Sequence, residues 1–237
     1  MKKLLITLAT FAATLVTATA TPVCVQGTLA SYIALGAGGC QIDDKIFANF
    51  VYQPTAVNAV APTADQVNVA PLPAPPGGQL NPGPGISFAS GGWTVVGPDK
   101  FIDSAISFTV TIAPGYPTRF INDASIIIAG NALFGGFSGV GETVVDATNI
   151  NNSLALDASI PSQPSENKVL PKGPTKTVLV TKDIIVTTFG GQANAVASLS
   201  IVQQRFSQID TQIPEPATAA LAGLALLGLG LIRRRIS

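Results

Sequence analysis

Residues 106–112 read Ile-Ser-Phe-Thr-Val-Thr-Ile, and this short stretch decides the fold class. Its four apolar side chains alternate with three hydroxylated ones. Because successive side chains of a β-strand point to opposite faces, the alternation predicts a strand with one buried and one solvated face. The turn signal Ala-Pro-Gly at residues 113–115 ends this strand.

Similar short stretches follow along the chain at the spacing expected of an all-β domain. Residues that form turns are frequent, with 23 glycines and 18 prolines among 237 residues. Residues 177–188 predict either a hairpin or one long bent strand with the charged pair Lys182-Asp183 at its bend. We expect a β-sandwich whose other strands lie at residues 93–96, 125–129, 142–147, 153–160 and 197–206.

Only two segments have a helical pattern, and both are short. They lie at residues 29–35 and 45–50 and would each make about two turns. Asp43 and Asp44 precede the second segment, and we expect them to form a solvated loop with a helix N-terminal cap. The glycines within residues 135–141 are predicted to form turns and not a phosphate loop, because no strand–loop–helix pattern and no suitably placed lysine accompany them.

Residues 54–85 contain eight prolines, a density that excludes a central strand. We interpret this segment as an insertion within one domain, with an edge strand around residues 66–69 and a loose loop after it. Extended polyproline segments that form a recognition surface are the alternative.

The N-terminus has the three parts of a secretory signal peptide. The first three residues are cationic, residues 4–16 are apolar apart from threonines, and Ala18 and Ala20 are the small residues that signal peptidase reads. We expect cleavage after Ala20, so that residues 1–20 form a signal peptide helix. A permanent N-terminal membrane helix and a lipid-modified Cys24 are the alternatives.

The C-terminus combines the motif Pro214-Glu215-Pro216, an apolar run at residues 217–232 and the basic cluster Arg233-Arg234-Arg235. Sixteen uncharged residues can span most of a bilayer core as a transmembrane helix, and the arginines then stop transfer and hold its end in the cytoplasm. This tail resembles the PEP-CTERM sorting signal of Gram-negative bacteria. The resemblance covers residues 213–237. It implies export through the inner membrane, transient anchoring there and processing by an exosortase near the Pro-Glu-Pro motif.

The expected exported domain, residues 21–212, carries 8 Lys and Arg residues against 12 Asp and Glu residues, a net charge near −4. It has no basic stripe, so nucleic-acid binding has no electrostatic basis. The two cysteines of an exported chain favour a disulfide, and Cys24 and Cys40 would close a loop of about 16 residues. Two unpaired thiols are the alternative. A zinc site is disfavoured, because the chain has no histidine and two cysteines cannot complete a structural site.

Catalytic chemistry has little support in the sequence, and we expect no enzyme, no cofactor and no metal site. The absent histidine is the commonest general base. Paired carboxylates could hydrolyse glycosides, and the tight acidic clusters are Asp43 with Asp44 and Asp99 with Asp103. Turn formation is the default role of the second pair, with calcium binding as the alternative. Trp93 is expected in the core, with sugar stacking as the alternative.

Several internal segments also resemble secreted PEP-CTERM proteins that place a cysteine-bracketed segment ahead of a β-sandwich. They are residues 29–35, 39–50, 141–143, 180–184 and 200–208. The set has no assigned biochemical activity, so the resemblance supports the fold alone. We expect a structural or adhesive protein at the cell surface or in the extracellular matrix, associated with exopolysaccharide. The alternatives are a carbohydrate-active enzyme that uses paired carboxylates and a calcium-stabilised binding module. The expected partners are signal peptidase, an exosortase and, transiently, the inner membrane.

Overall fold

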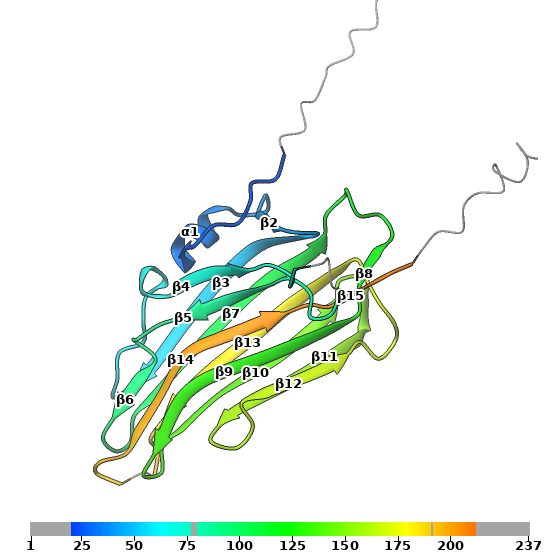
Figure 1. Ribbon diagram of the computed structural model, residues 1–237. Helices are drawn as coiled ribbons and strands as arrows, with labels where there is room; N and C mark the ends of the chain where they lie inside the picture. The colour runs from blue at the N-terminus through cyan, green and yellow to red at the C-terminus, as the bar shows by residue number, and fades with distance from the viewer. Residues whose placement is uncertain (1–19, 77–79, 191, 212–237) are drawn as a thin grey trace, which may run out of the picture.

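A computed structural model describes residues 20–76, 80–190 and 192–211, and it shows a β-sandwich (Figure 1). Two antiparallel sheets pack face to face, and their inner faces enclose one hydrophobic core. The expected all-β fold class is confirmed. Within the described part of the chain, no helix has the length and apolar character that a membrane span requires. The expected signal peptide helix and the transmembrane helix at residues 217–232 lie outside the described residues.

The first sheet has six strands, and the heptapeptide at residues 106–112 lies in one of its interior strands, β7. Side chains of β7 alternate between buried and partly exposed along its whole length, as the sequence predicts. The spatial order of the sheet is β11 (Asn149–Ile160), β10 (Phe137–Asp146), β13 (Thr177–Thr187), β7 (Phe101–Ile112), β3 (Lys45–Val57) and β2 (Cys40–Ile42).

The second sheet has seven strands and covers the inner face of the first (Figure 1). Its order is β1 (Gly27–Thr28), β4 (Asn68–Leu72), β5 (Gly85–Ala89), β14 (Val196–Arg205), β9 (Asp123–Leu133) and β12 (Ser165–Val169), with β6 (Thr94–Val96) paired to β14. A separate ribbon and two short helices complete the fold: β8 (Arg119–Ile121), β15 (Gln208–Asp210), α1 (Leu29–Ala34) and the 3₁₀ helix η1 (Ala64–Gln66).

The helix predicted at residues 29–35 is present as α1, but the prediction of a second helix at residues 45–50 is wrong. Residues 45–50 belong to β3, which pairs with β7 in a register that sets Phe47 opposite Val110. Long-range pairing with β7 and burial of the Phe47 side chain override the local helical pattern. The expected helix cap is therefore absent, and Asp43 instead adopts a φ of 50° in the turn between β2 and β3.

The proline-rich segment contributes strands at the sheet edges. Pro54 lies in the half of β3 that pairs with β7 alone, and Pro71 lies where β4 pairs with β5 alone. Proline is tolerated at such positions because no neighbouring strand needs its missing N–H. The strand expected around residues 66–69 is β4, shifted by a few residues.

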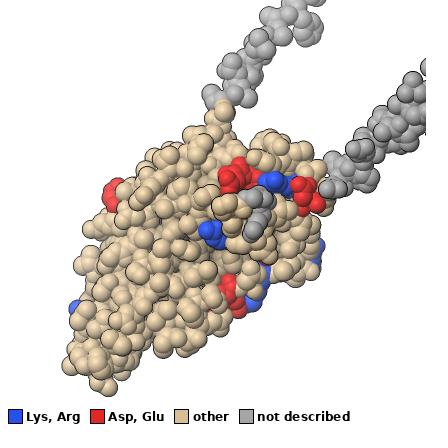
Figure 2. Space-filling model, in the orientation of Figure 1, with Lys and Arg blue, Asp and Glu red and all other residues tan. Residues whose placement is uncertain are grey.

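Both ends of the described chain lie at the same end of the sandwich, near α1, β8 and β15 (Figure 1). The face drawn in Figure 2 is largely uncharged, and its charged side chains gather toward that end. β7 ends there at Ile112, and it begins at Phe101 at the opposite end. Twelve residues of extended strand span about 40 Å, so the two ends of the sandwich are well separated.

Candidate functional site

The residues that the sequence assigns to sorting lie outside the described part of the chain. These are Ala18 of the signal cleavage site, the Pro214-Glu215-Pro216 motif and the Arg233-Arg234-Arg235 cluster. Ala20, the residue before the expected cleavage, is the first described residue and is exposed. The structure therefore bears on the folded domain and not on its targeting segments.

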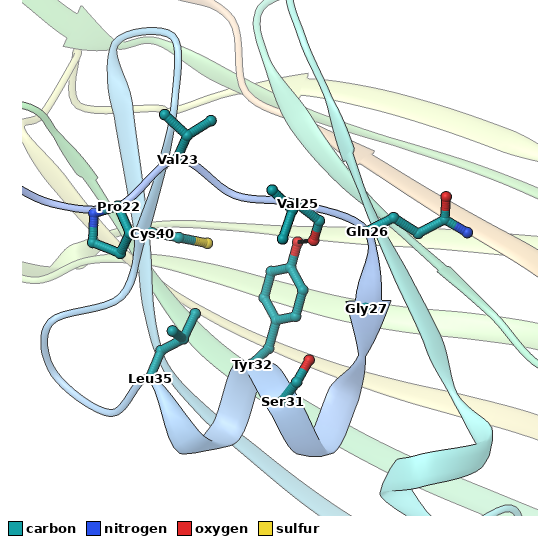
Figure 3. A pocket seen from close by; sticks show the side chains of 9 residues that line it. All are labelled: Pro22, Val23, Val25, Gln26, Gly27, Ser31, Tyr32, Leu35 and Cys40. Carbon is teal, nitrogen blue, oxygen red and sulfur yellow. Dashed lines mark hydrogen bonds between the residues drawn. The ribbon is translucent and has the colours of Figure 1, made fainter.

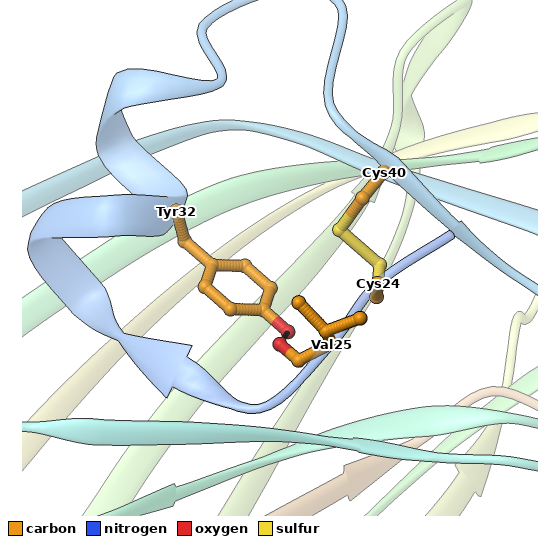
Figure 4. The surroundings of a disulfide bond; sticks show 4 residues. All are labelled: Cys24, Val25, Tyr32 and Cys40. Carbon is orange, nitrogen blue, oxygen red and sulfur yellow. Dashed lines mark hydrogen bonds between the residues drawn. A yellow bond between two sulfur atoms is a disulfide. The ribbon is translucent and has the colours of Figure 1, made fainter. Parts of the chain in front are cut away.

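The two cysteines form a disulfide that ties the N-terminal segment to the sandwich (Figure 4). Cys24 and Cys40 are both buried, and their Cα atoms are 4.8 Å apart. Beside them, the Tyr32 hydroxyl donates a hydrogen bond of 2.8 Å to the Val25 carbonyl. Burial raises the pKa of Tyr32 to about 12, so the phenol remains protonated and acts as a structural donor.

A pocket of about 230 Å³ lies between this braced segment and α1 (Figure 3). Its walls include Pro22, Val25, Tyr32 and Leu35, and none of the described residues that line it is charged. A largely apolar pocket of this kind can hold a small apolar group.

A second hollow lies on the outer face of the six-stranded sheet, where two glycines take the place of side chains. Gly139 and Gly141 border this groove of about 280 Å³. They belong to β10, so the turn expected at these two glycines is wrong. The strand register sets Gly141 between Asp157 of β11 and Asp183 of β13. A Cβ atom on Gly141 would meet only Asp157 Oδ1, at 3.7 Å, so this glycine leaves open space between two carboxylates.

A row of hydroxyl groups continues the groove along the same face. Thr143 is paired with Thr181 across β10 and β13, and Thr181 is paired with Ser107 across β13 and β7. All three side chains point outward, because they alternate with buried neighbours on each strand. Carboxylates and hydroxyls thus form a polar strip that runs along and across several strands.

Phenyl rings are exposed where this face reaches the end of the sandwich remote from both described termini. Phe101 and Phe189 stack with ring centroids 5.7 Å apart and an interplanar angle of 10°. Phe137 leans over Gly139, with a ring carbon 2.9 Å from the place a Cβ atom would occupy. Phe137 is 43% exposed and Phe189 is 52% exposed. Exposed aromatic side chains gathered beside a groove are typical of a binding surface.

Two acids on this face are close neighbours. Asp103 is paired with Ile185 and Asp183 with Ala105, so the two carboxylates are diagonal neighbours, about 7–8 Å apart at the backbone. Burial, and then the charge of Asp183, raises the pKa of Asp103. Its Oδ1 atom has no hydrogen-bond partner among the described residues.

The other acids singled out in the sequence do not join this pair. Asp99 occupies a turn with a φ of 53°, the role expected of it, whereas Asp103 lies within β7. Asp44, expected in a solvated loop, is buried with its Oδ1 atom 3.0 Å from Lys45 Nζ and its Oδ2 atom 3.2 Å from Arg119 Nη1. Within the described ranges, no three His, Cys, Asp or Glu side chains gather as a metal site would require.

Charged groups lie inside the core, where the sequence pattern did not predict them. β13 is one unbroken strand, so Lys182 points inward and only Asp183 faces solvent. Lys182 pairs with Glu142, and its Nζ atom lies 2.8 Å from Gln204 Oε1. The period of two could have predicted that Lys182 is buried, because this lysine lies on the same strand face as the apolar residues Val180 and Ile184. Trp93, in contrast, is buried as expected.

Residues 212–235 match the family described as PEP_exosort_dom, PEP-CTERM protein-sorting motif. The chain carries a PEP-CTERM sorting motif. The match includes Pro214-Glu215-Pro216 and the arginine cluster, as the sequence resemblance implies. A PEP-CTERM motif indicates an exported protein that is anchored in the membrane before an exosortase processes it.

Solved structures resemble the described domain only distantly. TmCBM61 in complex with beta-1,4-galactotriose has a TM-score of 0.31 at 13% identity, over 68% of this chain and 88% of that chain. The enzymatically active domain of bacteriophage CBA120 tailspike protein 4 has a TM-score of 0.23 at 13% identity, over 67% and 19%. The family 11 xylanase from Neocallimastix patriciarum has a TM-score of 0.18 at 10% identity, over 69% and 100%. No match was found among the curated proteins.

Proposed function

We propose that this PEP-CTERM protein is a non-enzymatic, glycan-binding component of the cell surface or extracellular matrix, with exopolysaccharide as its partner. One observation carries the proposal: the outer face of the six-stranded sheet combines an open groove with carboxylates, hydroxyls and exposed phenyl rings. We call this surface, from Phe101 and Phe137 to Ser107 and Thr143, the glycan face.

The chemistry of the glycan face suits a sugar chain. Each sugar ring has an apolar side that packs on an aromatic ring and a rim of hydroxyls that bonds to polar side chains. Phe137 supplies the first kind of contact, and Asp157, Asp183 and Thr181 supply the second. From Phe137 to Thr143 the strand extends about 20 Å, which is long enough for several sugar units.

The position of the glycan face is also favourable. Its aromatic end lies at the start of β7, whereas the described chain leaves the sandwich beyond the end of β7, about 40 Å away. The PEP-CTERM motif follows directly after residue 211. A protein held by that tail would therefore carry its phenyl rings away from the membrane surface.

The test is affinity electrophoresis of the purified protein in gels that contain a neutral β-glucan, a galactan or an acidic alginate. We expect at least one polysaccharide to retard the wild type and Gly141→Leu to abolish the retardation, because leucine fills the groove at a site where a Cβ atom fits. Gly141→Ala should have a smaller effect. Ile127→Ala, an exposed position on the other sheet, is the matched control and should bind normally. Absence of retardation, or retardation unchanged in Gly141→Leu, would contradict the proposal.

Glycoside hydrolysis is a second candidate because of one observation, the raised pKa of Asp103 beside Asp183. Glycosidases use two carboxyl groups that flank the scissile bond, and Asp103 and Asp183 are diagonal neighbours on this face. Prolonged incubation with each retarding polysaccharide, followed by a reducing-end assay, separates the two functions. Release of reducing ends that Asp103→Asn abolishes would establish an enzyme, whereas binding without release supports the non-enzymatic role.

A further inference from the structure

An amine, a carboxyl group and a carboxamide meet in the centre of the core. Lys182 and Glu142 are directly paired across β13 and β10 on the inner face of the six-stranded sheet. Gln204 reaches them from β14 of the opposite sheet. Lys182 and Gln204 are 0% exposed and Glu142 is 4% exposed, so water has no access to the three groups.

The amine lies against the carboxamide that it could attack. Lys182 Nζ is 2.8 Å from Gln204 Oε1. Because an amide C=O bond is about 1.23 Å long, Nζ lies within about 4 Å of the Gln204 Cδ atom. Reacting atoms in a near-attack geometry are about 3–3.5 Å apart, so a small shift suffices. The rings of Phe88 and Phe108, with centroids 5.8 Å and 5.7 Å from Nζ, wall the site.

Glu142 Oε1 and Gln204 Nε2 make no hydrogen bond of standard geometry among the described residues, although the Gln204 side chain lies close enough to Glu142 to oppose the rise of its pKa. Buried polar groups are almost always well paired, so this loose contact between a carboxyl group and a carboxamide calls for an explanation. Burial lowers the pKa of Lys182 and raises the pKa of Glu142, and the attraction between the two opposes both shifts. Both directions favour the uncharged amine, the form that can act as a nucleophile.

We propose that Lys182 and Gln204 form an intramolecular amide bond, with Glu142 as the proton carrier. The Nζ lone pair attacks Cδ, and the C=O π electrons move onto Oε1. Glu142, which starts protonated, gives its proton to Nε2 and takes one from the attacking nitrogen, so that it ends protonated again. The tetrahedral intermediate then collapses, the bond between Cδ and Nε2 breaks, and ammonia leaves. No electron transfer and no co-reactant is needed, and the net change is the loss of one ammonia.

The bond would join the two sheets through their interior. It links β13 to β14 and closes a loop with a sequence separation of 22 residues. Such a link holds the sandwich together against pulling and proteolysis, which suits a protein displayed outside the cell. This inference concerns the core and is independent of the glycan face.

A second lysine provides a comparison within the same chain. Lys45 Nζ donates to Gln208 Oε1 and lies 3.0 Å from Asp44 Oδ1. Here, however, Arg119 Nη1 is 3.2 Å from Asp44 Oδ2. The Asp44 carboxylate therefore has two cationic partners, whereas Glu142 pairs with Lys182. We therefore expect Lys45 to remain an ion pair.

The test is mass spectrometry of the folded full chain and of its tryptic peptides. Trypsin cannot cut after an acylated lysine, so the linked protein yields residues 177–205 as one peptide, lighter than its sequence by one ammonia. Chymotryptic cleavage after Phe189 should leave its two halves joined. Unlinked protein yields residues 177–182 and 183–205 separately. We expect the link in wild type and in the control Lys45→Met, and its loss in Lys182→Met and Glu142→Gln.

Two results would overturn the proposal. If wild-type protein has an unmodified mass and yields residues 177–182 and 183–205 as separate peptides, it contains no amide bond between Lys182 and Gln204. This measurement needs no variant, so it tests the proposal even if a variant fails to fold. A link that forms in Glu142→Gln to the wild-type extent would instead overturn the role of Glu142 as proton carrier. A cyclised asparagine also loses ammonia, but it would not keep the two halves joined after cleavage at Phe189.

Discussion

Phe108 occupies the centre of an aromatic cluster that joins the two sheets, and its replacement by alanine tests the core directly. The ring is 2% exposed. Its centroid lies 5.2–6.4 Å from the rings of Phe47, Phe50, Phe88 and Phe206. Because these neighbours come from both layers of the sandwich, no single strand can move inward to close the cavity that alanine would leave.

The expected loss of stability is large. Phe→Ala substitutions in cores cost about 3–5 kcal/mol, and poor collapse of the cavity places Phe108→Ala in the upper half of that range. Each aromatic contact contributes about 0.5–1.5 kcal/mol beyond its buried area, which acts in the same direction. For a domain of this size each kcal/mol lowers Tm by about 2–4 °C, so we expect a decrease of roughly 8–20 °C.

The assay is urea unfolding followed by the fluorescence of Trp93, which is the single tryptophan and is buried. The midpoint should fall while the m-value stays constant. Ser107→Ala, on the outer face of the same strand, is the matched control and should change the free energy of unfolding by less than about 0.5 kcal/mol. A loss below about 2 kcal/mol for Phe108→Ala would refute the packing of both sheets on this ring.

Four further perturbations have defined outcomes. Replacing Cys24 and Cys40 by serine should cost about 3 kcal/mol in urea unfolding, because the disulfide closes a loop in the unfolded chain; equal stability would contradict this. Burial lowers the pKa of Lys45 from 10.5 to about 8, so the unfolded chain binds more protons between these values. This lysine should therefore make stability rise with pH across that window, and the rise should be smaller in Lys45→Met than in wild type. Burial raises the pKa of Asp146, but hydrogen bonds outweigh burial and lower this pKa from 3.8 to about 2. The stability that ionised Asp146 contributes should therefore be lost as pH falls through that window. Asp146→Asn should not show this loss. Tyr32→Phe should cost about 1 kcal/mol in thermal unfolding, and no change would show that its hydroxyl bond is replaced by water.

Much of the fold could be predicted from local pattern. The alternation at residues 106–112 predicts β7, the same period predicts β14, and the spacing of strands along the chain predicts most of β11. Prediction failed at residues 45–50, where the apolar spacing also suits a helix. Pairing with β7 makes this segment a strand. The paired residues of β7 lie more than fifty residues away in sequence, so the pairing leaves no local signal at residues 45–50.

The candidate site was less predictable. Gly139 and Gly141 carry the usual mark of a turn, yet they lie inside β10 because strands pair with β10 on both sides. Asp103 and Asp183 are eighty residues apart in sequence and become neighbours only through the register of β7 and β13. Buried Lys182 was assigned to a bend, since a lysine inside a core is rare without a partner to neutralise it.

The sequence alone therefore determined the features that need no partner strand. The sorting tail is a linear sequence motif, and the period of two depends only on backbone geometry. Tertiary structure alone decided which residues meet: the groove beside Gly141, the acid pair on the outer face and the amine, acid and amide in the core. Each of these depends on strand order and register, where a shift of one residue turns every side chain to the opposite face.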